Sequence, residues 1–155
     1  MYELQAVIAD GETLSGMARD LPAARMAPIG EGLSLMPMTD ALFDSVADSS
    51  GVHALGFWRL PGGFERVLAD WSRSRPVAYV EAEYFGGVGE QRAAVWDGGT
   101  IVLGPIEVAE GQPFSSAGSP ISQALGRLGV EADAGQDEFS AVGLGRHRRS
   151  EAWIA

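Results

Sequence analysis

The sequence predicts an α+β fold, a single domain in which amphipathic helices pack against a mixed β-sheet. Residues 77–103 contain three short strand-like segments separated by glycine turns, the pattern of an antiparallel meander. Apolar residues also recur at helical spacing in several other segments. A chain of 155 residues can bury a core, and no stretch has the composition of a linker, so residues 1–155 are predicted to form one domain.

The first part of the chain predicts a strand followed by a helix. Residues 2–9 alternate in polarity and are apolar enough for a strand. Asp10 is a good N-cap for a helix over residues 11–20, which Pro22 ends. Shorter extended segments are expected over 26–29 and 33–36.

The middle of the chain predicts two helices on either side of a strand. Thr39 is a good N-cap for a helix that ends near Ala47. The segment 53–60 predicts a strand, with Ala54, Gly56, Trp58 and Leu60 on one face and Leu55, Phe57 and Arg59 on the other. The clearest helix runs from Phe64 to about Ser72, because its apolar residues have the spacing i, i+3, i+4 and i+7.

The meander follows Pro76. Its first strand, 77–85, is rich in β-branched and aromatic residues, and the glycine-rich segment 86–89 is predicted to be a four-residue loop. Only seven residues, 90–96, separate this loop from the next glycine turn, which is short for a helix and favours a strand. A third strand is expected over 100–103. In this register one face is apolar and suits the core, with Ala78, Val80, Ala82, Ala93, Val95 and Val102.

The last part of the chain predicts one further strand and two helices. Residues 106–109 can form a short strand. Ser119 followed by Pro120 is a strong helix start, and Gly129 ends that helix. Asp137 begins a short final helix.

The other face of the meander carries the candidate ligand-binding site. Glu83 is expected directly opposite Arg92, and Glu81 is expected to be the more exposed, ligand-facing carboxylate. Two interpretations stay open, because an ordinary structural ion pair has the same composition as a binding site. The candidate ligand-binding residues are Tyr79, Glu81, Glu83, Gly86, Gly87, Gly89, Arg92 and Trp96.

The composition excludes several kinds of chemistry. The chain has no cysteine and no lysine, so it has no disulfide, no thiolate zinc site and no cysteine or lysine nucleophile. Its net charge of −10 disfavours nucleic acid and anionic membranes as partners, and it suits a basic protein or a cationic ligand. The expected partner is therefore a basic protein or a small polar ligand. Arginine as the sole basic residue apart from histidine, with abundant Ala, Gly and Pro, indicates a bacterial genome of high GC content.

No motif in the sequence names a cofactor or a reaction. The Gly86–Gly89 segment lacks the strand–loop–helix context of a nucleotide site, so no cofactor is expected. A metal site built from His53, Glu81 and Glu83 needs a strand arrangement that the sequence does not show, and none is predicted. The basic run 146–149 is expected either to contact an acidic group or to balance the acidic residues of the domain itself.

The sequence is consistent with two functions. The first is a non-catalytic binding protein of the bacterial cytosol, in one form an immunity-type inhibitor of a basic toxin or enzyme. The alternative is a small hydrolase-like enzyme with Glu81 and Glu83 as acid and base, since side chains two residues apart on a strand lie about 7 Å apart. A cytoplasmic location is expected, because no apolar run reaches the length of a membrane span and Met1–Gln5 does not resemble the start of a signal peptide.

Overall fold

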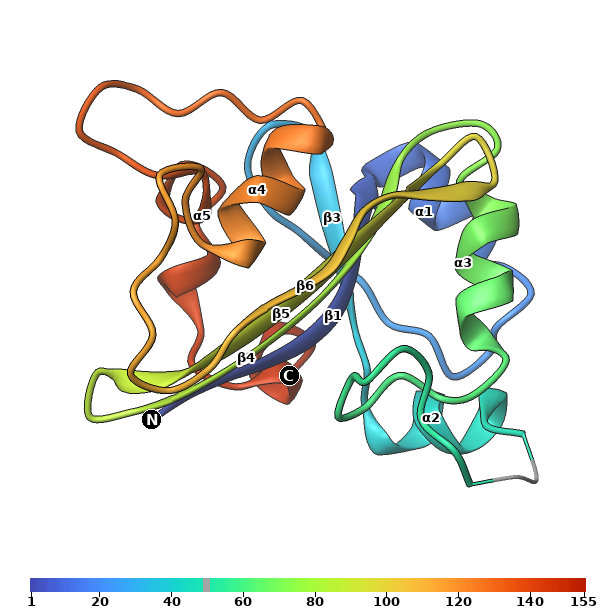
Figure 1. Ribbon diagram of the computed structural model, residues 1–155. Coiled ribbons are helices and arrows are strands. Elements are labelled where there is room, and N and C mark those ends of the chain that lie inside the picture. Colours follow the sequence, from blue (N-terminus) through green and yellow to red (C-terminus); the bar gives the residue numbers. More distant parts are fainter. Residues whose placement is uncertain (49–50) are drawn as a thin grey trace.

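The computed structural model describes residues 1–48 and 51–155, which form a six-stranded sheet with helices on both faces (Figure 1). The strand order is β2-β3-β1-β4-β5-β6. Every pairing in the sheet is antiparallel, where a mixed sheet was predicted. The α+β class and the antiparallel meander are confirmed. The strands are β1 (Tyr2–Asp10), β2 (Ala27–Pro28), β3 (Leu33–Pro37), β4 (Val77–Phe85), β5 (Val88–Asp97) and β6 (Thr100–Val108).

The helices begin where the sequence predicts. In four of them the predicted N-cap side chain accepts a hydrogen bond from the backbone N–H three residues further on, which satisfies one of the free N–H groups of the first turn. These caps are Asp10, Thr39, Ser119 and Asp137. Among the described residues, no helix has the length and apolar character needed to cross a membrane. The helices are α1 (Gly11–Ala18), α2 (Asp40–Val46), α3 (Phe64–Trp71), α4 (Pro120–Arg127) and α5 (Glu138–Ala141), followed by 3₁₀ turns at Leu144–Arg146 and Ser150–Trp153.

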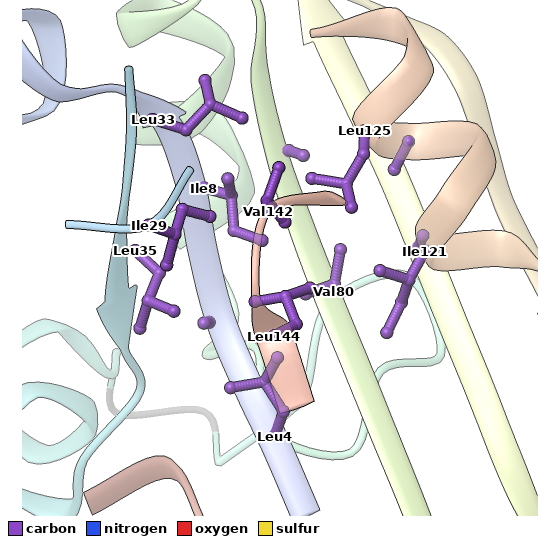
Figure 2. Packing of buried hydrophobic residues seen from close by; sticks show 14 of the residues in the cluster. Leu4, Ile8, Ile29, Leu33, Leu35, Val80, Ile121, Leu125, Val142 and Leu144 are labelled. Carbon is purple, nitrogen blue, oxygen red and sulfur yellow. The ribbon is translucent and has the colours of Figure 1, made fainter. Parts of the chain in front are cut away.

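Each face of the sheet carries its own hydrophobic core, because successive side chains of a strand point to opposite faces. Helices α4 and α5 cover one face, and α1, α2 and α3 lie on the other (Figure 1). The first core joins strand residues such as Leu4, Ile8 and Val80 to Ile121 and Leu125 of α4 (Figure 2). The second core contains Val7, Tyr79, Ala94, Trp96, Leu14, Leu42, Phe64 and Leu68.

The strand predicted over 53–60 is wrong, and this segment is a loop. Within it only His53 makes a β-bridge, to Pro61. Its buried apolar residues, Ala54, Phe57 and Leu60, recur every third position and insert into the second core. This burial of every third residue does not follow the alternation of a strand, because the chain turns over the sheet, with left-handed backbone at Leu55 and Gly56. We call the described residues of this connection loop 51–63.

The two short strands predicted over 100–103 and 106–109 form one continuous strand, β6. Its pairing with β5 has two register shifts, and at the second of them Val95 lies opposite Leu103 while Trp96 lies opposite Ile101. The extra residue, Val102, shifts the alternation. Leu103 consequently packs on the first core, where Val102 was predicted, and Val102 is 38% exposed.

Candidate functional site

Strands β4 and β5 form the hairpin that carries every predicted ligand-binding residue. The predicted four-residue loop is wrong: Gly86 and Gly87 form a two-residue turn with φ values of 62° and 82°, and Phe85 pairs with Val88. Two consecutive left-handed residues match the right-handed twist of a hairpin, and glycine adopts them without steric cost. The pairing therefore shifts by two residues, an even number, so the predicted faces of the hairpin are correct.

Glu81 lies opposite Arg92 and is completely buried, so the predictions of a Glu83–Arg92 pair and of an exposed Glu81 are both wrong. One carboxylate oxygen, Oε1, accepts from the Trp58 N–H at 2.6 Å, and Oε2 accepts from the Arg59 N–H at 2.7 Å. Backbone N–H groups of a loop that lies on a sheet have no ladder partner and need an acceptor. Glu81 supplies that acceptor and fastens loop 51–63 to the sheet.

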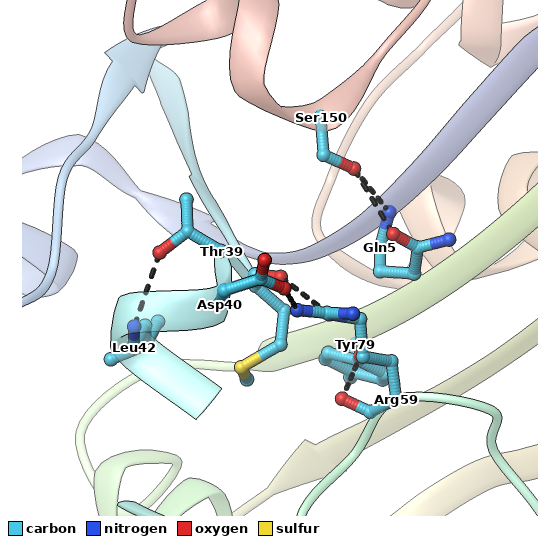
Figure 3. Close-up of polar contacts among 8 residues, drawn as sticks. Gln5, Thr39, Asp40, Leu42, Arg59, Tyr79 and Ser150 are labelled. Atoms are coloured by element: carbon cyan, nitrogen blue, oxygen red, sulfur yellow. Dashed lines mark hydrogen bonds and ion pairs between the residues drawn. The ribbon is translucent and has the colours of Figure 1, made fainter. Parts of the chain in front are cut away.

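Tyr79 completes this buried polar cluster. Its hydroxyl lies 3.0 Å from Oε2 of Glu81 and 3.0 Å from the Arg59 carbonyl oxygen, the second contact being drawn in Figure 3. Its ring packs edge-on against Phe57 of the loop, with centroids 5.0 Å apart. Burial raises the pKa of Tyr79 well above its ordinary value, so the hydroxyl stays protonated and remains a donor. Trp96 is also buried, in the second core.

Arg92 fixes the same loop from the neighbouring strand. Its guanidinium lies 4.5 Å from the centroid of the Trp58 ring, and it donates to the Gly56 carbonyl oxygen. Its Nε is 3.3 Å from the Glu107 carboxylate, and a terminal nitrogen is 3.7 Å from Glu90. Arg92, Glu81 and Tyr79 therefore hold loop 51–63 in place.

Burial raises the pKa of Glu81, while the hydrogen bonds from Trp58, Arg59 and Tyr79 and the charge of Arg92 act in the opposite direction. The folded chain thus binds this proton more tightly than the unfolded chain, where the ordinary pKa is 4.5. The contribution of Glu81 to stability should be complete below that pH and should decrease as the pH rises to the folded pKa. Urea unfolding of the wild type and Glu81→Gln from about pH 4 to about pH 8 should show a stability difference that falls with pH. A difference that grows with pH would contradict this assignment.

An exposed groove lies at the free end of the hairpin, on the same face as Glu81. We call it the acidic groove. It has a volume of about 300 Å³, and three carboxylates line it, while none of the described residues that line it is basic. Phe85 is 76% exposed and Val88 is 50% exposed at its edge, so two large apolar side chains face solvent among the carboxylates. The acidic groove is lined by Trp58, Glu83, Phe85, Val88, Gly89, Glu90 and Glu110.

The predicted site residues divide between these two regions. Glu83 and Gly89 line the acidic groove, and Gly86 and Gly87 form the turn beside it. The other four predicted residues, Tyr79, Glu81, Arg92 and Trp96, support the structure and do not line it.

Sequence reasoning placed Phe85 on the face of the candidate site, but it missed four other groove residues: Trp58, Val88, Glu90 and Glu110. Phe85 and Val88 flank Gly86-Gly87. A prediction that these two glycines form a complete two-residue turn would have paired Phe85 with Val88. Glu90 opposite Glu83 follows from the same register. Trp58 and Glu110 come from segments outside the hairpin, and no local signal in the sequence places them there.

The other candidate groups from the sequence have local structural contacts. His53 packs edge-on against Phe43, with ring centroids 5.6 Å apart, and in residues 1–48 and 51–155 no cluster of three or more His, Cys, Asp and Glu could hold a metal ion. In the basic run 146–149, His147 and Arg146 both contact the ring of Trp153. The Arg148 carbonyl oxygen accepts from the Glu3 N–H at 2.8 Å, so this run attaches the C-terminal turn to β1.

The two carboxylates of the predicted acid–base pair lie in different surroundings. Both oxygens of Glu81 are occupied by backbone N–H groups, and the side chain has no solvent-accessible surface through which a substrate could reach it. Glu83 is exposed and lies opposite another carboxylate, Glu90. Comparison with protein-family models, with curated proteins and with solved structures finds no match to this chain.

Proposed function

We propose that this chain is a non-catalytic interaction protein that binds a basic protein through the acidic groove. The observation that carries the proposal is the exposed ring of Phe85, which lies among the carboxylates of Glu83, Glu90 and Glu110. Protein interfaces commonly combine a central aromatic residue, buried on binding, with a charged rim that selects the partner.

Contacts within the protein support the Trp58 side of the groove. Trp58, which lines it, belongs to loop 51–63, and its backbone N–H is held by the buried Glu81 carboxylate. The guanidinium of Arg92 lies over its ring. These contacts position Trp58 before a partner binds, and preorganisation lowers the entropic cost of binding.

The charge of the whole chain supports a basic partner. A net charge of −10 gives a negative field that attracts a basic protein over a longer range than the groove itself. In its specific form, the proposal is an immunity-type inhibitor of a basic toxin or enzyme in the bacterial cytosol. Arginine and lysine side chains of such a partner would pair with the three groove carboxylates around Phe85.

The test is to immobilise the chain, capture proteins from the native cytosol and measure the binding of the captured protein at low and high salt. The captured partner should be basic, and its association rate should fall as salt rises. Phe85→Ala should weaken its binding by about 30-fold, which corresponds to about 2 kcal/mol. Glu83→Gln, Glu90→Gln and Glu110→Gln together should mainly slow association.

A matched control changes the same amount of charge elsewhere. Glu131→Gln, Asp133→Asn and Glu151→Gln together also remove three exposed carboxylates, none of which lines the acidic groove. This variant should bind nearly as the wild type does. Equal losses in the two triple variants, a partner without excess positive charge, or an unchanged affinity in Phe85→Ala would refute the proposal.

A further inference from the structure

A second hollow lies on the opposite face of the hairpin from the acidic groove. Ala82 and Tyr84 of β4 line it, whereas Glu83 between them lines the acidic groove. Its volume is about 280 Å³, close to the lower limit for small-molecule sites. We call it the aromatic pocket, because four rings line it: Tyr2, Tyr84, Phe114 and Phe139.

Three of these rings are positioned by the sheet and its covering helix. Tyr2 of β1 pairs directly with Tyr84 of β4. The ring of Tyr2 packs edge-on against Phe139 of α5, with centroids 5.5 Å apart and an interplanar angle of 61°. Its hydroxyl donates to the Leu144 carbonyl oxygen at 2.9 Å, which fixes the ring. The fourth ring, Phe114, follows β6 and is 49% exposed, so it forms an open side of the pocket.

The polar groups of the pocket do not suit an anion. Two helix N-termini reach it, but N–H groups of their first turns are already bonded to protein acceptors at Ile121, Ser122 and Ser140. In α4, the Ile121 N–H donates to Gln91 Oε1 at 3.1 Å and the Ser122 N–H donates to Ser119 Oγ at 3.1 Å. In α5, the Ser140 N–H donates to Asp137 Oδ1 at 2.8 Å.

The charged side chain that lines the pocket is acidic. Asp137 lines it with an exposed carboxylate, and none of the described residues that line it is basic. Aromatic rings attract cations through the negative potential of their faces, and a carboxylate beside them strengthens the attraction. A neutral apolar ligand would gain nothing from the carboxylate and would remove part of its hydration.

We propose that the aromatic pocket binds a small organic cation of the alkylated ammonium class. Such a ligand has an apolar, cationic head that several rings can surround, and it lacks the tightly held hydration shell of a metal ion. The proposal is independent of the acidic groove, since the two sites lie on opposite faces of the hairpin and share no lining residue.

The test compares two probes of the same shape in an NMR titration of the full chain. Choline carries the ammonium group, and 3,3-dimethyl-1-butanol has a neutral carbon in place of the nitrogen. Choline should bind about tenfold more tightly, with shifts of the signals of Tyr2, Tyr84, Phe114 and Phe139. Equal binding of the two probes, or no binding of choline, would overturn the proposal.

Three variants locate the cation. Asp137→Asn keeps a residue that can cap α5 and removes the charge, so choline affinity should fall about threefold or more while the neutral alcohol is unaffected. Phe114→Leu, at an exposed position, should weaken choline binding by about fivefold. Phe85→Leu in the acidic groove should leave it unchanged. If Phe85→Leu alone weakens choline binding, the cation lies in the acidic groove and the proposal is wrong.

Discussion

Glu81→Gln is expected to lower the free energy of unfolding by about 3 kcal/mol. The amide keeps one oxygen to accept a hydrogen bond, but its NH₂ group must face the N–H of either Trp58 or Arg59, both of which now donate to the carboxylate. One backbone N–H then loses its acceptor in a buried position, whereas both oxygens of a carboxyl group can accept. Loop 51–63 should open before the rest of the chain unfolds.

Urea unfolding gives the total effect, and hydrogen exchange of the Trp58 and Arg59 amides reports the loop directly. Glu83→Gln is the matched control, because it makes the same chemical change two residues away at an exposed position and should alter stability by less than about 0.5 kcal/mol. Protected amides at Trp58 and Arg59 in Glu81→Gln, together with wild-type stability, would show that this carboxylate does not hold the loop.

Gly89→Ala is expected to separate the ends of β4 and β5 and to destabilise the chain by about 2 kcal/mol or more. A Cβ atom at Gly89 would lie 1.9 Å from the Glu83 carbonyl oxygen and 2.7 Å from the Tyr84 Cα, both backbone atoms that cannot rotate away. The hairpin must therefore shift, and Glu83 and Val88 of the acidic groove shift with it. The same variant should bind the basic partner more weakly than the wild type.

Gly16→Ala provides the contrast for this prediction. Gly16 lies inside α1, and a Cβ atom there would have no neighbour within 4 Å. Alanine at this position should stabilise the chain by about 0.5–1 kcal/mol, because it reduces the freedom of the unfolded state and favours helix. In thermal unfolding, the melting temperature should rise for Gly16→Ala and fall for Gly89→Ala. A Gly89→Ala variant as stable as the wild type would refute the close packing at the hairpin end.

Local signals in the sequence determined the helices and the two faces of the β4–β5 hairpin. The caps at Asp10, Thr39 and Ser119 depend on a bond to a residue three positions away, so they can be read from a few residues. The faces depend on alternation alone, which a register shift of two residues leaves intact. For that reason Ala82 was predicted on the correct face although its strand partner was not.

Only the tertiary structure decided what Glu81 and loop 51–63 do. The N–H groups that bind Glu81 lie 23 and 22 residues earlier in the chain, and their need for an acceptor arises only once the segment around Phe57 packs on the sheet as a loop. In sequence, Glu81 and Glu83 are equivalent carboxylates on one strand face. Loop 51–63 covers Glu81 but leaves Glu83 exposed. Glu81 is therefore a buried hydrogen-bond acceptor for the loop, and Glu83 is part of the acidic groove.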